Sequence, residues 1–491
     1  MNTIKWVITL LYPTLFMSSM MAWSAQASLV QATSAHQELG QIENAHSEST
    51  QSINEIIDEY VRDGLGSNLA LQGATLEVER SQAALDAARA RFLPEASIVA
   101  RYTRADGGRE ISLPLAAAFN PVYGTLNELL LADGQAPRFG LIEDPRFLLQ
   151  REREQDTRLA IRQPLFVPAI PAAVRAQKAA LAANDFAHLA LSQRLRRDIT
   201  VGYLDWLQAD RAARILSASQ KLLEENLRVT RALFENGVIT RDQVLRAEAE
   251  SLALTQQRIE IDGGVNQLRA YVNFLLNRGL DTALKIGHID TELDAAARDL
   301  ATLRAAALDQ RAELSQIRSA TAVAAARRDL ARAERLPTLA LAIDGGTQGE
   351  RYEFGRGRNF ATLSLLLNWT LFDGGARRAD ERAARLVERQ FGLRSEELRQ
   401  SIQLEVQQAL DALLAAEAAT RAATARAEAA RAAFTIATRK RDAGVISQVE
   451  FIDAQTTLTA AELDLNRLRF AVISRQAELD YATGGSSLSP L

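Results

Sequence analysis

The 491-residue sequence contains no cysteine. Disulfide bonds, thiolate metal ligands, cysteine nucleophiles and a lipid-modified N-terminal cysteine are therefore excluded. Aromatic residues make up only 6% of the chain, and the net charge of −4 is too small to indicate a nucleic-acid partner. The chain is instead rich in alanine, the strongest helix former, so its composition favours long helices.

Histidine is also scarce, and the sequence shows no recognisable catalytic motif. The four histidines are scattered, at His36, His46, His188 and His288. They do not have zinc-site spacing, and no phosphate-binding loop, nucleophile elbow or evident acid/base pair of carboxylates is present. The sequence therefore predicts a protein that is not an enzyme and that needs no cofactor or metal.

The N-terminus has the pattern of a secretory signal. Lys5 precedes an apolar stretch over residues 6–21, and Ala25-Gln26-Ala27 follows as a small-x-small cleavage motif. We expect residues 1–27 to be the signal peptide and residues 28–52 to form a flexible, polar extension. The alternative, an uncleaved membrane anchor, is disfavoured because a proline and two serines interrupt the apolar stretch.

The rest of the chain consists of two related halves. Three pairs of segments resemble each other at offsets of 206 or 207 residues: 163–166 with 369–372, 235–240 with 442–447, and 277–279 with 483–485. A fourth pair, ending at Pro94 and Pro337, is 243 residues apart. The first half therefore carries about 36 extra residues (243 − 207) after Pro94, which we expect to form a long loop.

Each half contains two segments in which apolar and polar residues alternate. The clearest has Leu363, Leu365 and Leu367 on one face, with Thr362 and Ser364 on the other. Strands are predicted at about 95–104, 156–165, 338–347 and 360–371. Any one segment alone fits a half-buried hairpin of a soluble sheet, but four behind a signal peptide favour strands that cross a membrane.

Between the strands lie unusually long helical segments. Residues 172–236 contain no proline and one glycine, and their apolar or small residues recur at coiled-coil spacings of three and four. Two turns, Gly237-Val238-Ile239 and Gly444-Val445-Ile446, interrupt the helical pattern. Their glycines suit helix C-caps, and Thr240 and Ser447 suit the N-caps of return helices.

The predicted organisation follows from these landmarks. A first structural repeat covers residues 53–279, a connecting segment 280–300, a second repeat 301–485 and a C-terminal tail 486–491. The predicted fold class is mainly helical with a small membrane β-barrel part, in which long coiled-coil-like helices form an α-barrel. The four strands of one chain cannot close a barrel, and open edges in lipid are costly, so the chain must form an oligomer.

The order and duplication of these motifs resemble the TolC-like family of outer-membrane efflux proteins, over residues 53–485. Besides the two turns, the resemblance is carried by Asn68-Leu69-Ala70-Leu71, Arg91-Phe92-Leu93-Pro94, Leu371-Phe372-Asp373-Gly374-Gly375 and Gln455-Thr456-Thr457-Leu458. The resemblance implies a homotrimer in the lipid of the cell outer membrane, with a tunnel in the periplasm. It also implies docking to a periplasmic adaptor and coupling to an inner-membrane pump or ABC exporter, as in tripartite efflux and type I secretion.

The resemblance further implies a functional site at the periplasmic end. Gly237-Val238-Ile239 and Gly444-Val445-Ile446 match the tips that meet the adaptor, and Glu450 and Asp453 match acidic residues around the closed aperture. These two lie three residues apart and share a helix face, so three copies would gather six carboxylates that favour cations. Without the resemblance, they are a solvated acidic face. Arg441 and Ile446 replace the aromatic and basic residues that lock the aperture in the best-known members, so that lock is missing or built differently.

A second function fits part of the sequence. A periplasmic coiled-coil adaptor or scaffold without channel activity would also contain long helical hairpins. The alternating strands and the doubled layout favour the channel. A heat-resistant oligomer in outer-membrane fractions would support the channel, and a soluble periplasmic protein would contradict it.

Overall fold

The computed structural model describes residues 51–149, 151–288 and 298–485. The expected signal peptide and C-terminal tail lie outside the described residues. So do most of the expected N-terminal extension and part of the connecting segment.

The described residues divide between two compact units. The helical unit comprises the described residues of Met1–Ser81, Ala180–Thr321 and Arg389–Leu491, and the sheet unit comprises Gln82–Ala179 and Ala322–Glu388. Each unit has its own hydrogen bonds and side-chain contacts.

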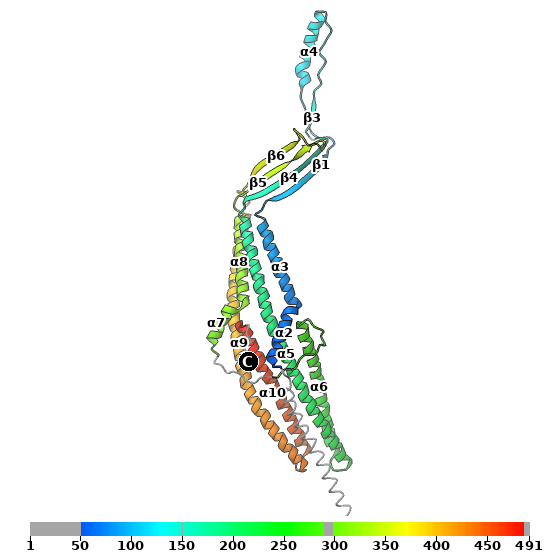
Figure 1. Ribbon diagram of the computed structural model, residues 1–491, viewed down its shortest axis with the longest axis vertical. Coiled ribbons are helices and arrows are strands. Elements are labelled where there is room, and N and C mark those ends of the chain that lie inside the picture. The colour runs from blue at the N-terminus through cyan, green and yellow to red at the C-terminus, as the bar shows by residue number, and fades with distance from the viewer. Residues whose placement is uncertain (1–50, 150, 289–297, 486–491) are drawn as a thin grey trace, which may run out of the picture. The chain divides into compact units, whose positions relative to one another are not determined.

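The order of elements occurs twice along the chain. The first half has α2 (Ile53–Ser67), α3 (Leu69–Ala90), β1 (Glu95–Arg104), β4 (Arg153–Phe166), α5 (Ala169–Glu235) and α6 (Arg241–Leu275). The second half has α7 (Leu300–Gln310), α8 (Ala312–Ala333), β5 (Thr338–Gly349), β6 (Asn359–Asn368), α9 (Ala376–Asp442) and α10 (Gln448–Thr483). The chain is thus mainly helical with a small sheet, as predicted (Figure 1). Of the helices described, none is both long and apolar enough to cross a membrane.

The prediction of a loop between the first two strands is wrong. This segment contains β2 (Glu110–Ser112), α4 (Leu115–Ala132) and β3 (Arg146–Leu148), which form a hairpin. The amide of Asn120 exchanges hydrogen bonds of 2.8 and 3.0 Å with the backbone of Ile142. The offset between the repeats gives the number of extra residues. It does not reveal that asparagine side chains hydrogen-bond a helix to the segment that returns beside it.

The four main strands form one antiparallel sheet in the order β1-β4-β5-β6. Their register aligns the apolar sets, so that Ala96, Ile161, Ile343 and Leu363 form one row across the sheet. The side chain of Leu363 on this face is 72% exposed. The opposite face carries charged residues, among them Arg158, which lies 3.9 Å from Asp156 and from Asp344. The sheet therefore has an exposed apolar face and a polar face.

Strand β6 ends three residues before the predicted position of 371. Its last pair joins Asn368 to Thr338, the first residue of β5, and Pro337 precedes that residue. The alternating pattern continues through Trp369 and Leu371, but no neighbouring strand remains to pair with them. Alternation predicts which face a side chain takes, whereas strand length depends on the partner strand.

An aspartate and an arginine fix the chain where β6 leads into α9. The carboxylate of Asp373 accepts hydrogen bonds from the N–H groups of Gly375 (3.0 Å) and Arg377 (3.2 Å), which caps the start of α9. The guanidinium of Arg377 donates to Asp373 (2.6 Å) and to the carbonyl oxygens of Glu334 (2.8 Å) and Thr370 (2.6 Å). One ion pair thus joins the ends of α8 and β6 to the first turn of α9.

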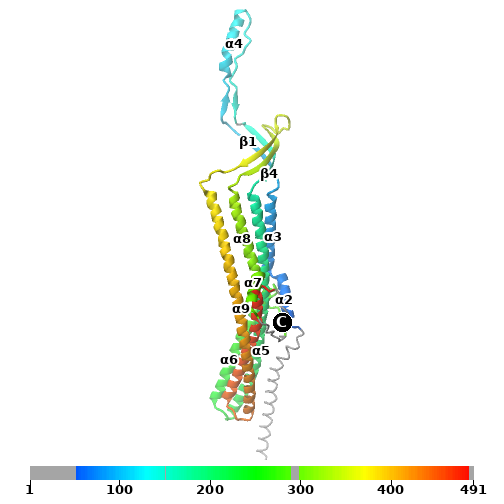
Figure 2. The ribbon, with the colours of Figure 1, turned by 90° about the vertical axis from the view of Figure 1, so that its left-hand side faces the viewer.

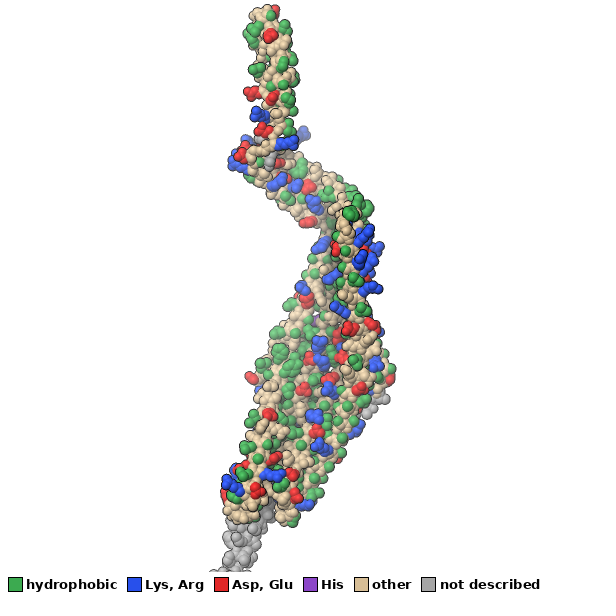
Figure 3. Space-filling view, turned by 180° about the vertical axis from the view of Figure 1, so that it is seen from behind, with side chains coloured by type: hydrophobic (Ala, Val, Ile, Leu, Met, Phe, Trp, Pro, Cys, Tyr) green, Lys and Arg blue, Asp and Glu red, His purple; other side chains and the backbone are tan. Residues whose placement is uncertain are grey.

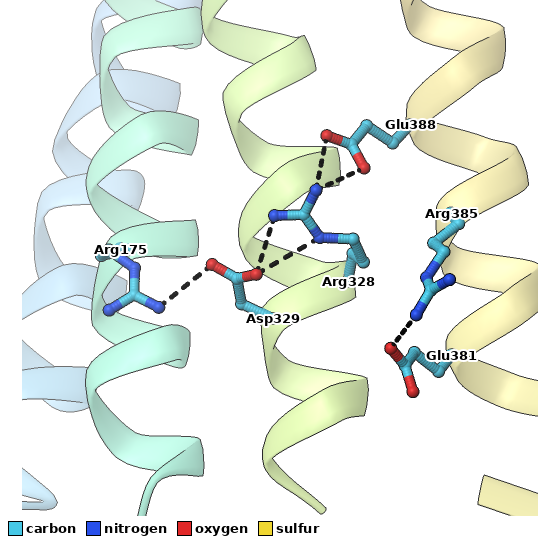
Figure 4. Close-up of polar contacts among 6 residues, drawn as sticks. All are labelled: Arg175, Arg328, Asp329, Glu381, Arg385 and Glu388. Atoms are coloured by element: carbon cyan, nitrogen blue, oxygen red, sulfur yellow. Dashed lines mark hydrogen bonds and ion pairs between the residues drawn. The ribbon is translucent and has the colours of Figure 1, made fainter. Parts of the chain in front are cut away.

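Arginine–carboxylate pairs connect the helices of the sheet unit (Figure 4). Arg328 on α8 lies 2.9 Å from Glu388 on α9, and its neighbour Asp329 lies 3.3 Å from Arg175 on α5. Within α9, Glu381 pairs with Arg385. The side chains that pair between helices are partly exposed, so each of these pairs contributes little to stability and mainly fixes which helices are neighbours, whereas Glu381 is buried.

The core of the helical unit forms where α2 packs on α5 and α6. Buried side chains of α2, including Ile56 and Tyr60, meet Ile199 and Tyr203 of α5. The two tyrosine rings pack edge to face with centroids 5.5 Å apart. Both hydroxyls bond the backbone of Lys285, so the aromatic pair is buried without an unsatisfied polar group.

Gly346 allows β4 and β5 to pair closely. A Cβ there would lie 2.2 Å from the carbonyl oxygen of Thr157 and 2.6 Å from the Cα of Arg158. Because these are backbone atoms, Gly346→Ala should lower the free energy of unfolding in urea by about 1–3 kcal/mol. Gly345→Ala is the matched control, because its nearest atom would be the Phe360 carbonyl oxygen at 3.9 Å. Equal losses in both variants would contradict this account.

The Asp373–Arg377 pair predicts a pH dependence. The hydrogen bonds from Arg377 lower the pKa of Asp373 from 3.8 to about 2. A carboxyl group whose pKa falls on folding stabilises the fold above the unfolded value and loses that contribution as pH falls through the folded value. Asp373→Asn keeps a capping side chain but loses the charge. Its unfolding temperature should therefore lie below that of the unsubstituted chain at neutral pH, with the difference vanishing between about 3.8 and about 2.

Circular dichroism during heating at a series of pH values measures this difference. Asp380→Asn, which removes another carboxylate from the first part of α9, is the control. If the gap between Asp373→Asn and the unsubstituted chain stayed constant over that pH range, the ion pair would not be its cause.

Candidate functional site at the helix turns

The two predicted tips have the same backbone geometry. Gly237 and Gly444 both have φ of +70°, a value that favours glycine. The N–H of Val238 donates to the carbonyl oxygen of Leu233, and that of Val445 to Lys440, each at 2.9 Å. The N–H groups of the two glycines donate to the carbonyl oxygens three residues earlier, also at 2.9 Å, and together these bonds form Schellman motifs that end α5 and α9. The glycines therefore serve as the helix C-caps that the sequence predicted.

The tips present apolar side chains to the surface. Val238 is 66% exposed and Val445 is 71% exposed, while Ile239 and Ile446 are half-buried beneath them. An exposed valine on a tight, glycine-capped turn forms a small rigid apolar surface. Such a surface can contact a partner with little loss of conformational entropy.

The two return helices begin differently. The Ser447 hydroxyl accepts from the N–H of Glu450 (3.2 Å), and the Glu450 carboxylate accepts from the N–H of Ser447 (3.4 Å). This is a capping box. Thr240 stands at the N-cap of α6 but makes no side-chain capping bond. The exposed Glu450 therefore also holds the first turn of α10, a role that its predicted place at an aperture did not require.

Asp453 lies opposite a positive charge from the other half of the chain. Its carboxylate is 3.8 Å from the guanidinium of Arg246 on α6, and both side chains are more than half exposed. At the repeat offset of 207, Arg246 is the counterpart of Asp453 (453 − 207 = 246). Opposite charges at matched positions of the two repeats were the signal in the sequence that could have indicated this pair.

Arg441 contacts side chains of its own hairpin. Its guanidinium lies 4.2 Å from the ring centroid of the buried Phe451 and pairs with Asp442 at 3.1 Å. Phe451 in turn packs on Phe434 of α9, with ring centroids 5.6 Å apart. These contacts keep Arg441 within the α9–α10 hairpin and stabilise its tip.

A row of buried polar contacts joins α5 to α10, and sequence reasoning missed it. Near the tips, the Gln448 amide donates to the side chains of Asn226 (2.6 Å) and Thr230 (2.9 Å). Further along, Ser219 and Thr459 share a hydrogen bond of 2.8 Å. Figure 2 shows these helices beside one another in the helical unit. The contacts link the two repeats, and polar residues at buried helical positions were their only trace in the sequence.

The charged side chains near the tips face solvent. Glu450, Asp453 and Arg246 are exposed charges. In the described parts of the chain, histidine and carboxylate side chains do not gather in threes as a metal site needs. The arrangement offers a charged, solvent-facing surface next to apolar tips.

A comparison with known protein families gives a match in the second half of the chain. Residues 303–485 match the family model for outer membrane efflux proteins. No curated protein sequence matches the chain. The resemblance to this family, inferred from the sequence, is thus confirmed for that range.

The fold is shared with solved outer-membrane proteins over most of the chain. The CmeC channel of Campylobacter jejuni has a TM-score of 0.73 and 17% identity, over 88% of this chain and 86% of its own. VceC of Vibrio cholerae has a TM-score of 0.71 and 17% identity, over 87% of this chain and 96% of its own. The open state of the MtrE channel of Neisseria gonorrhoeae has a TM-score of 0.70 and 18% identity, over 88% of this chain and 89% of its own.

The contact between Gln448 and α5 is testable. Gln448→Ala leaves the buried Asn226 and Thr230 side chains short of one partner, at a cost of about 1–3 kcal/mol. We expect faster amide hydrogen exchange in the first turns of α10 and in the facing turns of α5. Gln243→Ala, in the first turn of α6, should leave these rates unchanged. Unaltered exchange in Gln448→Ala would show that the buried contact does not hold the two helices together.

Proposed function

Since residues 303–485 carry an outer membrane efflux protein domain, we propose that this chain is the channel subunit of an export system. It acts as the exit duct of a tripartite efflux pump or a type I secretion system in the cell outer membrane. The observation that carries the proposal is the sheet of four strands, with an exposed apolar face, charges on its other face and two unpaired edges.

The unpaired edges support a homotrimer. In lipid, each unpaired backbone group costs several kcal/mol, so the outer edges of β1 and β6 need partners. Pairing the β1 edge of one copy with the β6 edge of the next closes a ring of three copies and twelve strands. The apolar face of the ring then meets lipid, and Arg158, Asp156 and Asp344 face a water-filled lumen.

The long helices support a tunnel in the periplasm. α5 and α9 each contain 67 residues and would extend roughly 100 Å at 1.5 Å per residue. On the α9 side, part of the seam between α9 and α10 consists of the small residues Ala423, Ala427 and Ala430, which let the helices approach closely. Twelve helical strands from three copies make the tube.

The tips provide the docking surface for a periplasmic adaptor. The exposed Val238 and Val445 on rigid turns suit contacts with the apolar positions of a helical hairpin. Through the adaptor, the duct is coupled to an inner-membrane pump or ABC exporter. The transported substance is selected there, because the polar duct itself is built for passage.

Glu450 and Asp453 form the cation-selective ring at the periplasmic aperture. Three copies gather six carboxylates, which attract cations and repel anions. Arg246 partly offsets the charge of Asp453, so Glu450 carries more of the selectivity.

Single-channel recording in planar bilayers tests both the duct and the ring. The purified mature protein should show cation-selective openings. Glu450→Gln with Asp453→Asn should lower the ratio of cation to anion permeability by about twofold or more. Glutamine is accepted at this position of a capping box, so the substitution removes charge without removing the cap. Asp242→Asn, in the first turn of α6, is the matched control and should leave selectivity unchanged.

The outcomes separate the parts of the proposal. Openings whose selectivity is the same in all variants would keep the channel and remove the ring. Folded, helical protein that never inserts, and that is absent from outer-membrane fractions, would favour the periplasmic scaffold instead.

A further inference from the structure

The hairpin around α4 carries a row of exposed apolar side chains, which we call the α4 seam. It consists of Leu115, Phe119, Val122, Leu126 and Leu129, each between 36% and 62% exposed. Their spacing of four, three, four and three residues is that of the a and d positions of a coiled coil. Figure 3 shows hydrophobic side chains along this hairpin, with few charged ones between them.

The neighbouring face of α4 is already occupied by the returning chain. Besides Asn120, the Asn127 amide bonds the backbone of Phe139 at 2.7 and 3.0 Å. The Tyr123 ring packs against that of Phe139, with centroids 5.3 Å apart. The Asp144 carboxylate accepts from the N–H of Ala116 at 2.6 Å. The hairpin is therefore folded on itself, and within the described chain α4 has no buried residue.

Alone, α4 is a weak helix. Its 18 residues include Pro121, which removes a backbone hydrogen bond, and Gly124, which raises the entropy cost of helix formation. Short helices in water depend on packing for most of their stability. A helix with this composition and an uncovered heptad seam is expected to pack against a partner.

The connectivity of the sheet identifies the partner as another copy of this chain. The hairpin joins β1 to β4 at the strand ends opposite those that connect to α3 and α5. In the proposed trimer, the free edge of β1 meets the next copy. The hairpin therefore emerges beside that interface, three times around one axis, with the three α4 helices parallel.

A lipid surface fits the α4 seam less well. Helices that lie on membranes carry Lys and Arg on their polar face. α4 contains neither, and Glu128 is its one residue that is charged at neutral pH. The low charge also means that three copies of α4 can approach without strong repulsion.

We propose that the α4 seams of three copies pack together as a parallel helical bundle on the outer side of the membrane. The inference rests on the proposed trimer and adds to it an interface beyond the barrel. Each helix supplies about 27 Å of seam, at 1.5 Å per residue for 18 residues. The bundle stabilises α4 and covers the apolar side chains that one chain leaves in water.

Disulfide cross-linking tests the bundle, because the chain has no cysteine and any introduced thiol is unique. Leu126→Cys and Val122→Cys place the thiol in the seam. Glu128→Cys places it on the same helix, turned about 200° from position 126. A disulfide needs Cα atoms within about 4.4–6.8 Å. After mild oxidation of outer-membrane fractions, both seam variants should give a covalent dimer on non-reducing gels, and Glu128→Cys should give little.

The mass of each variant in detergent, measured by light scattering, distinguishes the two levels of the proposal. Trimers with seam-specific cross-links support the bundle. Trimers without cross-links at positions 122 and 126, or with equal cross-linking at 128, overturn the bundle and leave the channel proposal standing. Monomers throughout overturn both.

Discussion

The unpaired outer edges of β1 and β6 are the constraint on which the proposed assembly depends. A backbone N–H or C=O group that leaves water must find a partner, and a four-stranded sheet with an exposed apolar face leaves two rows of such groups without one. Pairing edge to edge between copies satisfies them and closes a barrel. The apolar residues that would be a liability on a soluble protein, such as Ile98 and Leu365, then become the surface that lipid covers.

Duplication gives the molecule its layout, but the two halves use different local chemistry. At the junction of strand and helix, the second half uses Asp373 and Arg377 to join three chain segments. The first half has Val167 and Pro168 at the corresponding place, and a proline at the start of α5 needs no capping side chain. The same contrast appears at the tips, where only the second half has the box of Ser447 and Glu450.

The polar row between α5 and α10 gives the helical unit specificity as well as stability. Alanine-rich seams pack closely but tolerate shifts in register, because one small side chain resembles another. Buried pairs such as Ser219 with Thr459 permit one register, since any shift would leave them unsatisfied. They also tie the first repeat to the second near the tips, where an adaptor is proposed to dock and an aperture to open.

Much of the fold was predictable from the sequence because it follows from local rules. Period-two alternation identified four strands and their apolar faces, heptad spacing identified long helices, and the glycines at 237 and 444 marked their ends.

The contacts between distant residues were not predictable. Arg246 beside Asp453, Gln448 on Asn226 and Arg441 over Phe451 depend on which helices become neighbours. The helix in the long insertion was missed because Pro121 and Gly124 weaken its pattern. The asparagine amides that fasten it act only once the chain has folded back. Local sequence patterns set the elements and their faces, since these depend on neighbouring residues. Tertiary structure decided strand ends, charge pairs and the uncovered α4 seam, since these depend on partners far away in the chain.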